Sequence, residues 1–367
     1  MSERSLTFAV VGLGYWGPNL LRVLVDDVDV TVRWLCDLDV SRLERFARRY
    51  PGIMTTQSIV DVLADDAVDA VLIATPVFSH FELCTRSLSA GKHTFVEKPL
   101  ATSATKADAL LRLARARDRV LMCGHTFVYS PAVNAVKRML DDQVLGTVYF
   151  ISSSRVNLGL HQRDVSVIWD LGPHDFSILL HWLGERPETV RAVGRDSIVK
   201  GVADVAFITL VFPSGIVTHV ELSWLSPSKL RRTVVVGSEK MVVYEDGAPE
   251  PIRLFDHGVV YSDPETFGQY HLSYRTGDIV APKLETYEPL GAELADFGRA
   301  IREHDEMRYH STLARDVVAI TEAASRSLDA GGAEVRVDGR RAPRRRRLSS
   351  GDRQAPALAP VVAGSVR

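Results

Sequence analysis

Two short motifs in this sequence carry groups that could act on a bound dinucleotide. In the first, Gly12, Gly14 and Gly17 form a G-x-G-x-x-G pattern directly after an apolar run. This pattern alone is only weak evidence for a dinucleotide site. The second motif is Glu97-Lys98-Pro99, at the end of a later apolar run. It adds a titratable group near the place where a nicotinamide would lie. Together the two motifs favour a dehydrogenase over a generic nucleotide binder.

Oxidising a secondary alcohol requires a group that removes the hydroxyl proton and a group that stabilises the developing alkoxide. Lys98 suits the second role because it is cationic and Pro99 disfavours a helical backbone there; a surface lysine is the alternative. Asp170 and His174 lie four residues apart, so a helix that starts near Leu171 puts them on one face. His174 is then the predicted base and Asp170 its orienting partner or a substrate ligand. A helix cap plus a packed histidine is the alternative.

The glycine motif, with Tyr15 and Trp16 inside it, is the predicted pyrophosphate site. Gly12 permits the tight turn, Gly14 lets the backbone approach the phosphates, and Gly17 lets the helix pack on the strand. The N-terminus of the following helix offers free N–H groups and a partial positive charge.

Asp37 follows the second predicted strand, where a carboxylate binds the adenosine ribose hydroxyls in folds of this kind. The same charge would repel a 2′-phosphate, so we expect NAD rather than NADP. Asp37 could instead cap the next helix, a role for which Asp39 competes.

Other candidate cofactor contacts follow later strands. Thr75-Pro76 ends the third strand at the edge of the sheet where ligands bind, although a simple turn explains it nearly as well. His80 begins the next helix and could be structural. Glu97 is a candidate because it precedes Lys98 at the end of its strand.

The first 125 residues alternate apolar runs with helical segments. The predicted strands are 6–11, 30–36, 68–75, 93–96 and 120–123, and the predicted helices are 15–24, 41–50, 80–89 and 104–117. Such alternation predicts an α/β Rossmann domain with a doubly wound parallel sheet.

After residue 125 the segments lengthen and turn signals separate them. The predicted strands are 148–156, 190–193, 205–212, 216–225, 232–236 and 241–244, and the predicted helices are 131–140, 173–183, 290–302 and 312–330. Residues 245–290 are rich in Pro, Gly and Asp and are predicted to be irregular. This half is therefore predicted to be an α+β domain with an antiparallel sheet.

Four motifs, in the same order, make the chain similar to the Gfo/Idh/MocA family (glucose–fructose oxidoreductase, inositol dehydrogenase and relatives). They are the glycine motif at 12–17, Ala-Thr-Pro at 74–76, the stretch 90–100 with its Glu-Lys-Pro, and Trp-Asp-Leu-Gly-Pro-His-Asp at 169–175. The resemblance covers residues 6–338. It implies an NAD-binding Rossmann domain (1–125) and a substrate-binding, oligomerisation domain (126–338) whose open, largely antiparallel sheet packs face to face in homodimers or homotetramers. It also implies hydride transfer between NAD and an alcohol or ketone of a sugar-like substrate.

Polar residues near Trp169 are the predicted substrate contacts. Arg155 and Asn157 end the first strand of the second domain and Arg163 follows in a loop; in this architecture they face the nicotinamide. Each arginine could bind a phosphate or carboxylate or lie in solvent. Similar segments in relatives that act on nucleotide-linked sugars favour a sugar nucleotide. A free sugar, a cyclitol, a dihydrodiol or aldehyde, and a non-catalytic NAD-binding regulator remain open.

Composition adds several exclusions. Hydrophobic residues make up 46% and charged residues 25%, as in soluble globular proteins, and no apolar run is long enough to span a bilayer. Three cysteines without C-x-x-C spacing argue against a zinc site or disulfide framework and favour the cytoplasm; we expect no metal. Eight Arg and one Asp between Arg340 and Arg367 predict a basic, disordered tail (339–367) rather than a nucleic-acid arm.

Overall fold

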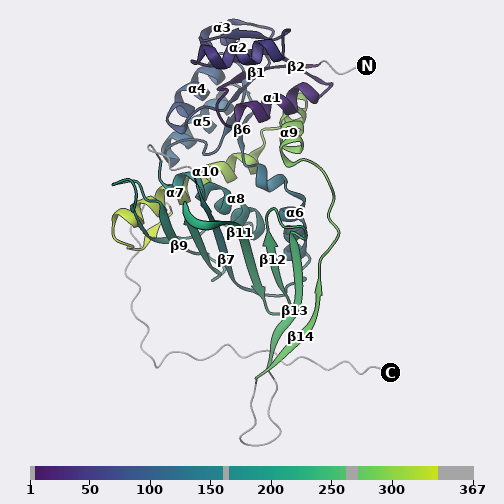
Figure 1. Ribbon diagram of the computed structural model, residues 1–367, viewed down its shortest axis with the longest axis vertical. Helices are drawn as coiled ribbons and strands as arrows, with labels where there is room; N and C mark the ends of the chain where they lie inside the picture. The colour runs from purple at the N-terminus through teal and green to yellow at the C-terminus, as the bar shows by residue number, and fades with distance from the viewer. Residues whose placement is uncertain (1–4, 160–164, 262–271, 338–367) are drawn as a thin grey trace, which may run out of the picture.

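The computed structural model describes residues 5–159, 165–261 and 272–337. Arg163 and the arginine-rich tail lie outside these residues. Figure 1 shows two sheets, one in each half of the chain, with helices packed against each of them. None of the helices in the described ranges is long and apolar enough to cross a membrane.

The first sheet is parallel throughout and has six strands. In spatial order they are β3 (Met54–Thr56), β2 (Val30–Cys36), β1 (Leu6–Val11), β4 (Ala70–Ile73), β5 (His93–Glu97) and β6 (Leu121–Gly124). Its helices are α1 (Gly17–Asp26), α2 (Val40–Arg49), α3 (Ile59–Ala64), α4 (Val77–Ser89) and α5 (Ala104–Ala116). This strand order is that of a doubly wound dinucleotide-binding fold, so the predicted Rossmann domain is confirmed.

Helices α1 and α4 begin two or three residues away from their predicted starts. Helix α1 starts at Gly17 rather than at residue 15, because Trp16 is its N-cap and Pro18 occupies the first turn, where a missing N–H costs nothing. Helix α4 starts at Val77, directly after Pro76, rather than at residue 80.

The central strand β1 is buried on both faces, as its continuous apolar run requires. Phe8 and Val10 belong to one apolar core, and Ala9 and Val11 belong to the core on the opposite face. Helix α9 (Pro289–Glu303) returns from the second half of the chain and adds Phe297 to the first of these cores. Figure 1 shows α9 beside α1. The division of the chain at residue 125 remains a prediction.

The second sheet has nine strands. In spatial order they are β14 (Leu272–Val280), β13 (Ile252–Tyr261), β12 (Met241–Glu245), β11 (Leu225–Gly237), β7 (Val148–Leu158), β10 (Val217–Ser223), β9 (Val205–Val211), β8 (Thr189–Arg195) and β15 (Val335–Arg336). Only β7 and β10 pair in parallel among these strands. The prediction of a largely antiparallel sheet is confirmed.

The prediction that residues 245–290 are irregular was wrong. Strand β13 pairs with β12, and β14 pairs with β13, which adds two antiparallel strands to the sheet edge (Figure 1). The Pro, Gly and Asp residues of this segment suggested loops, but its apolar and β-branched residues pair with an existing strand. Such tertiary pairing overrides local propensity.

Helices cover one face of the second sheet. They are α6 (Pro131–Asp141), α8 (Gly172–Leu183) and α10 (Arg308–Asp329), with the short segments η1 (Thr126–Tyr129) and α7 (Val167–Asp170) beside them. Helix α10 also contacts the parallel sheet, because Ala314 and Val318 belong to a core of that sheet while Leu313 and Val317 belong to the core of the second one. The two halves therefore share a helix at their junction.

Candidate functional site

The carboxyl ends of the parallel strands bring the predicted cofactor residues to one edge of the sheet. Gly12 follows β1, Asp37 follows β2, Thr75 lies two residues after β4, and Lys98 follows β5. His125 follows β6 at the same edge. Ligands bind outside this edge in doubly wound folds.

The geometry of the glycine loop suits a pyrophosphate. Gly12 has φ +94°, and a Cβ there would lie 2.5 Å from the carbonyl oxygen of Ala74. A Cβ on Gly17 would lie 1.9 Å from the carbonyl oxygen of Gly12, so both positions require glycine. A Cβ on Gly14 would meet only Arg42, at 3.7 Å, which leaves the backbone open to a ligand.

The loop also leaves the start of α1 available. Trp16 is the N-cap and makes no side-chain capping hydrogen bond, so the first N–H groups can donate to an anion. Tyr15, next to it, is exposed. The residues present fit a dinucleotide phosphate.

Asp37 is buried at the end of β2 and is held by the backbone. Its Oδ2 accepts the Leu13 N–H at 2.6 Å and its Oδ1 accepts the Asp39 N–H at 2.8 Å. Asp39 is the N-cap of α2 and accepts N–H groups of its first turn. Arg42 lies 3.5 Å from Asp37 and 3.3 Å from Asp39, so two carboxylates offset its charge. The ribose contact of Asp37 stays a prediction.

His80 bridges the segments that follow β4 and β5. It is buried, and its two ring nitrogens lie 2.8 Å from the carbonyl oxygens of Pro99 and Thr75. The Thr75 hydroxyl meets the Ser79 hydroxyl at 2.7 Å. These contacts give His80 a structural task at the edge; direct cofactor contacts of Thr75, Pro76 and His80 stay predictions.

Glu97 lies next to the Trp16 side chain, and one of its carboxylate oxygens is buried. Burial raises the pKa of Glu97 to about 8, although Lys98 acts in the opposite direction. Glu97 therefore holds a proton over part of the neutral range. Its contact with the cofactor stays a prediction.

Lys98 joins the two halves of the chain. Its Nζ donates to the carbonyl oxygen of Asp170 at 2.8 Å and lies 3.5 Å from Asp170 Oδ1. The other carboxylate oxygen of Asp170 accepts Trp224 Nε1–H at 3.1 Å. These contacts hold Lys98 where the two halves of the chain meet, with part of its side chain exposed.

His174 lies one turn beyond Asp170, in the first turn of α8. Its ring is steeply inclined to the Phe127 ring, with the two ring centroids 5.2 Å apart. Burial lowers the pKa of His174 well below its usual range, and the charges of Lys98, Arg155 and Arg231 lower it further. The ring is therefore neutral at neutral pH and has a lone pair to accept a proton. That Asp170 orients this ring stays a prediction.

The predicted substrate residues lie in different settings. Arg155 is buried, pairs with Asp175 at 2.5 Å and packs over the Phe127 ring, so its charge is offset inside the protein. Asn157 lies against Gly159, close to Trp224. Trp169 packs against a core of the parallel sheet. Substrate contacts of these residues stay predictions, and Arg163 lies outside the described residues.

Three residues near the site were missed from the sequence. Arg231 reaches the site from β11, and its guanidinium lies 6.0 Å from the Phe127 ring centroid. His125 was detectable, because it lies two residues after the predicted parallel strand 120–123. Glu293 was detectable too, as an acid on the apolar stripe of Leu290, Leu294 and Phe297 in α9.

Two family models match the chain. Residues 6–125 match the model described as the oxidoreductase family with an NAD-binding Rossmann fold. Residues 133–243 match the model of the GFO/IDH/MocA C-terminal domain. The two matches together cover more than half of the sequence.

Individual relatives have related but different activities. The chain is 26% identical to the 2,7-anhydro-N-acetylneuraminate hydratase of Escherichia coli, over 59% of this chain and 61% of that protein. It is 28% identical to the UDP-N-acetylglucosamine 3-dehydrogenase of Acidithiobacillus ferrooxidans, over 71% of this chain and 78% of that protein. The first alignment thus spans only about three fifths of the relative.

Among solved structures, the chain resembles GenD2 from gentamicin A biosynthesis, which was crystallised in complex with NAD. The TM-score is 0.77 and the identity 26%, over 92% of this chain and 97% of GenD2. The likeness therefore extends through both sheets.

Proposed function

The chain belongs to the Gfo/Idh/MocA family, and on that premise we propose that it is an NAD-dependent oxidoreductase acting on a secondary alcohol or ketone of a sugar or sugar nucleotide. One observation carries the proposal. Lys98, from the cofactor sheet, contacts Asp170 of the second half, one turn before His174. A cation and a neutral imidazole thus meet at the edge where a nicotinamide would lie.

The glycine loop and the start of α1 would hold the pyrophosphate, and Asp37 would hold the ribose. Bound NAD supplies the hydride acceptor. NAD is preferred over NADP because Asp37 repels a 2′-phosphate, while Arg42, the nearest cation, is already offset by Asp37 and Asp39.

The proton chemistry falls to two side chains. Lys98 donates a hydrogen bond to the substrate oxygen and stabilises the negative charge that develops on it. His174 accepts the hydroxyl proton, since its lowered pKa keeps the ring neutral. Asp170 holds the Lys98 ammonium in place through its carbonyl and carboxylate oxygens.

The similarity to a UDP-N-acetylglucosamine 3-dehydrogenase supports a sugar nucleotide as the substrate. A cyclitol is the alternative within the same chemistry. The similarity to a hydratase adds another reaction type, in which product forms without net NADH. Three free, buried cysteines support a cytoplasmic setting.

The test is NADH formation with a panel of sugars, cyclitols and sugar nucleotides, run with NAD and with NADP, together with product analysis. We expect Lys98→Ala and His174→Ala to lower turnover by about 10²–10⁴-fold. Both variants should still bind NAD, because neither residue holds the pyrophosphate.

Turnover like that of the wild type in either variant would contradict the assignment of that residue. Tight NAD binding without conversion of any panel member would favour the non-catalytic regulator. Conversion without NADH accumulation would favour a hydratase.

A further inference from the structure

Buried ionisable side chains lie behind the site and have no task in the chemistry above. His125 is 2% exposed and Glu293 is fully buried. Both ring nitrogens of His125, and one carboxylate oxygen each of Glu97 and Glu293, are buried without a protein partner among the described residues. Proteins rarely leave buried polar atoms unsatisfied, and ordered water or a functional role normally accounts for such cases.

Two matched hydrogen bonds lead outward from this cluster. The hydroxyl of Thr126 donates to Glu293 Oε2 at 2.7 Å, and the hydroxyl of Tyr129 donates to Asp296 Oδ2 at 2.6 Å. The two donors lie three residues apart in η1, and the two acceptors lie three residues apart in α9. Each step is about one helical turn, so the contacts form the inner and outer rungs of a ladder between the two helices.

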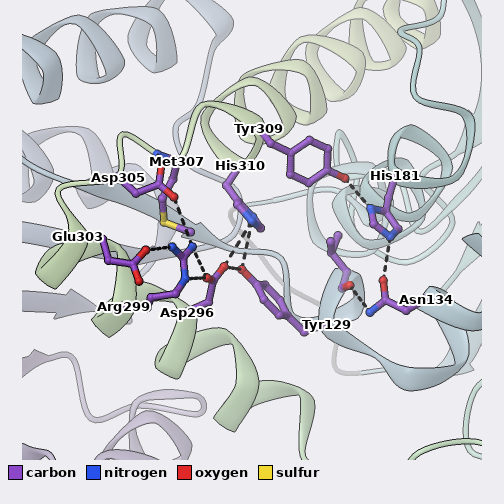
Figure 2. Close-up of polar contacts among 11 residues, drawn as sticks. Tyr129, Asn134, His181, Asp296, Arg299, Glu303, Asp305, Met307, Tyr309 and His310 are labelled. Carbon is purple, nitrogen blue, oxygen red and sulfur yellow. Dashed lines mark hydrogen bonds and ion pairs between the residues drawn. The ribbon is translucent and has the colours of Figure 1, made fainter.

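The outer rung reaches the surface. Figure 2 shows Asp296 between Tyr129, His310 and Arg299. The Tyr129 hydroxyl lies 3.2 Å from His310 Nε2, and the two rings stack at 5.5 Å. Arg299 also contacts Glu303, which is exposed, and Asp305, which is half-buried. A proton that reaches Asp296 or His310 is therefore close to solvent.

His125 directly precedes Thr126 of the inner rung, and its backbone interacts with Glu293. Burial lowers the pKa of His125 to about 3, with His310 and Lys98 adding to the effect. A charge on His125 in turn lowers the pKa of His174. His125 thus lies within electrostatic range of both the predicted base and the outer rung.

The pKa of Glu293 shifts in the opposite direction from that of His125. Burial raises its pKa well above the usual range, and the carboxylates of Glu97 and Asp296 raise it further, whereas Thr126 and the backbone of His125 lower it. Cys123, on β6, also lies close to Glu97 and Glu293. Burial therefore favours the uncharged form of both Glu293 and His125.

We propose that His125 and Glu293 relay the proton released at the site to solvent, by way of Asp296, Tyr129 and His310. This rests on the proposed function. When the alcohol is oxidised, the carbinol hydrogen leaves as hydride and the hydroxyl proton passes to His174. That ring must lose the proton before the next turnover, although bound substrate covers it. In the reduction direction the same ladder delivers the proton.

Uncharged groups suit such a relay. A neutral imidazole can take a proton on one ring nitrogen and release another from the second. A protonated carboxyl can likewise accept on one oxygen and donate from the other. Neither group needs to hold a buried charge for long, which desolvation disfavours. Ordered water can join the unpartnered atoms of His125 to their neighbours.

The variant Glu293→Gln distinguishes a role of Glu293 in proton transfer from a purely structural role. Glutamine keeps an acceptor for Thr126 but does not exchange a proton readily. In a single turnover, we expect NADH absorbance to rise as in the wild type, while a pH-indicator dye reports proton release that lags by about 10²-fold. Glu322→Gln is the matched control, because Glu322 is a half-buried carboxylate that accepts the Ala104 N–H at 2.9 Å away from the ladder. It should show no lag.

Asp296→Asn tests the half-buried outer rung. Proton release should lag behind NADH formation in this variant as well, and the change carries less risk to folding. Proton release that keeps pace with NADH in both variants would overturn the relay. A second readout needs no substrate: infrared spectra of the cofactor-free protein at neutral pH should contain a protonated-carboxyl band that weakens in Glu293→Gln and not in Glu322→Gln. An unchanged band also overturns the proposal. Absence of NADH formation in the wild type would contradict the proposed function instead.

Discussion

The base of the proposed reaction is surrounded by positive charge. Lys98, Arg155 and Arg231 each lower the pKa of His174, after burial as the largest cause. In the oxidation direction the neutral ring is the active form, so activity is lost only when the pH falls below this lowered pKa. The enzyme should therefore keep its activity at pH values where an ordinary histidine is already protonated.

Arg231→Gln tests this electrostatic effect. Removing one positive charge raises the pKa of His174, so the acidic limb of the kcat/KM profile should move to higher pH by up to about one unit. Arg231 is preferable to Arg155, because Arg155 is buried with Asp175 and its loss would leave an unpaired charge.

Arg253→Gln is the control for that measurement. Arg253 forms an ion pair with Glu245 at 3.2 Å on the neighbouring strands, much as Arg231 pairs with Asp246 at 2.8 Å. It is not among the charges that act on His174. A limb that stays in place, or moves to lower pH, in Arg231→Gln would contradict the argument.

At the scale of single residues, the sequence predicted those that belong to a motif with recognisable spacing. It missed residues whose importance depends on contacts formed only in the folded chain. Lys98 was found through its motif, and the structure joins it to Asp170. Arg155 was predicted from its type, but only the structure reveals Asp175 as its partner. Glu293 and Thr126 meet across 167 residues of chain, a contact that no local pattern contains.

At the scale of elements, the turn between β1 and α1 determines whether a dinucleotide can bind. Gly17→Ala would place a Cβ 1.9 Å from the Gly12 carbonyl oxygen, so the loop must shift or α1 must move off the sheet. We expect a loss of roughly 2–4 kcal/mol in the free energy of unfolding and NAD affinity lowered by at least tenfold. Denaturant unfolding and calorimetric titration with NAD measure the two effects.

Gly52→Ala is the control, because a Cβ at Gly52 meets nothing within 4 Å. Its effect on stability should stay within about 0.5 kcal/mol. If Gly17→Ala binds NAD as the wild type does, the loop is not the pyrophosphate site.

Elements with strong local signals were predictable, and elements formed by pairing were not. Parallel strands such as β4 are short buried apolar runs between helices and were predicted from the pattern, whereas the short strand β3 and helix α3 were missed. Strands β13 and β14 lie in a segment with many turn-forming residues and gain their ladder only from β12. Helix α9 was predicted as a helix, but its place on the parallel sheet depends on Phe297 meeting Phe8 and Phe95.

At the scale of the whole molecule, α9 and α10 hold the two halves in a fixed relation. Phe297 lies in a core of the parallel sheet, and α10 contributes to cores in both halves. Lys98 and His174 come from different halves, so their spacing depends on these helices. A site at such a junction suits a reaction between a cofactor and a substrate held by separate domains.

Within residues 5–159, 165–261 and 272–337, no helix covers the outer face of the second sheet, which carries apolar side chains. Phe150, Val217 and Phe207 are each 41–46% exposed there, and Phe150 and Val217 are neighbours in register on β7 and β10. A group of exposed apolar residues of this kind marks an interaction surface. We propose that a second copy of this chain covers it, since a sheet face can pack on itself about a two-fold axis.

The double change Phe150→Asp and Phe207→Asp tests this surface. Each carboxylate would have to be desolvated in the interface without a partner, which costs several kcal/mol, so we expect a dimer or tetramer in the wild type and a monomer in the variant. Light scattering after gel filtration measures the mass, and circular dichroism checks the fold. Val28→Asp, at a position 94% exposed in the first half, should leave the assembly intact. A monomeric wild type, or a double variant that keeps its assembly, would show that this face is not the interface.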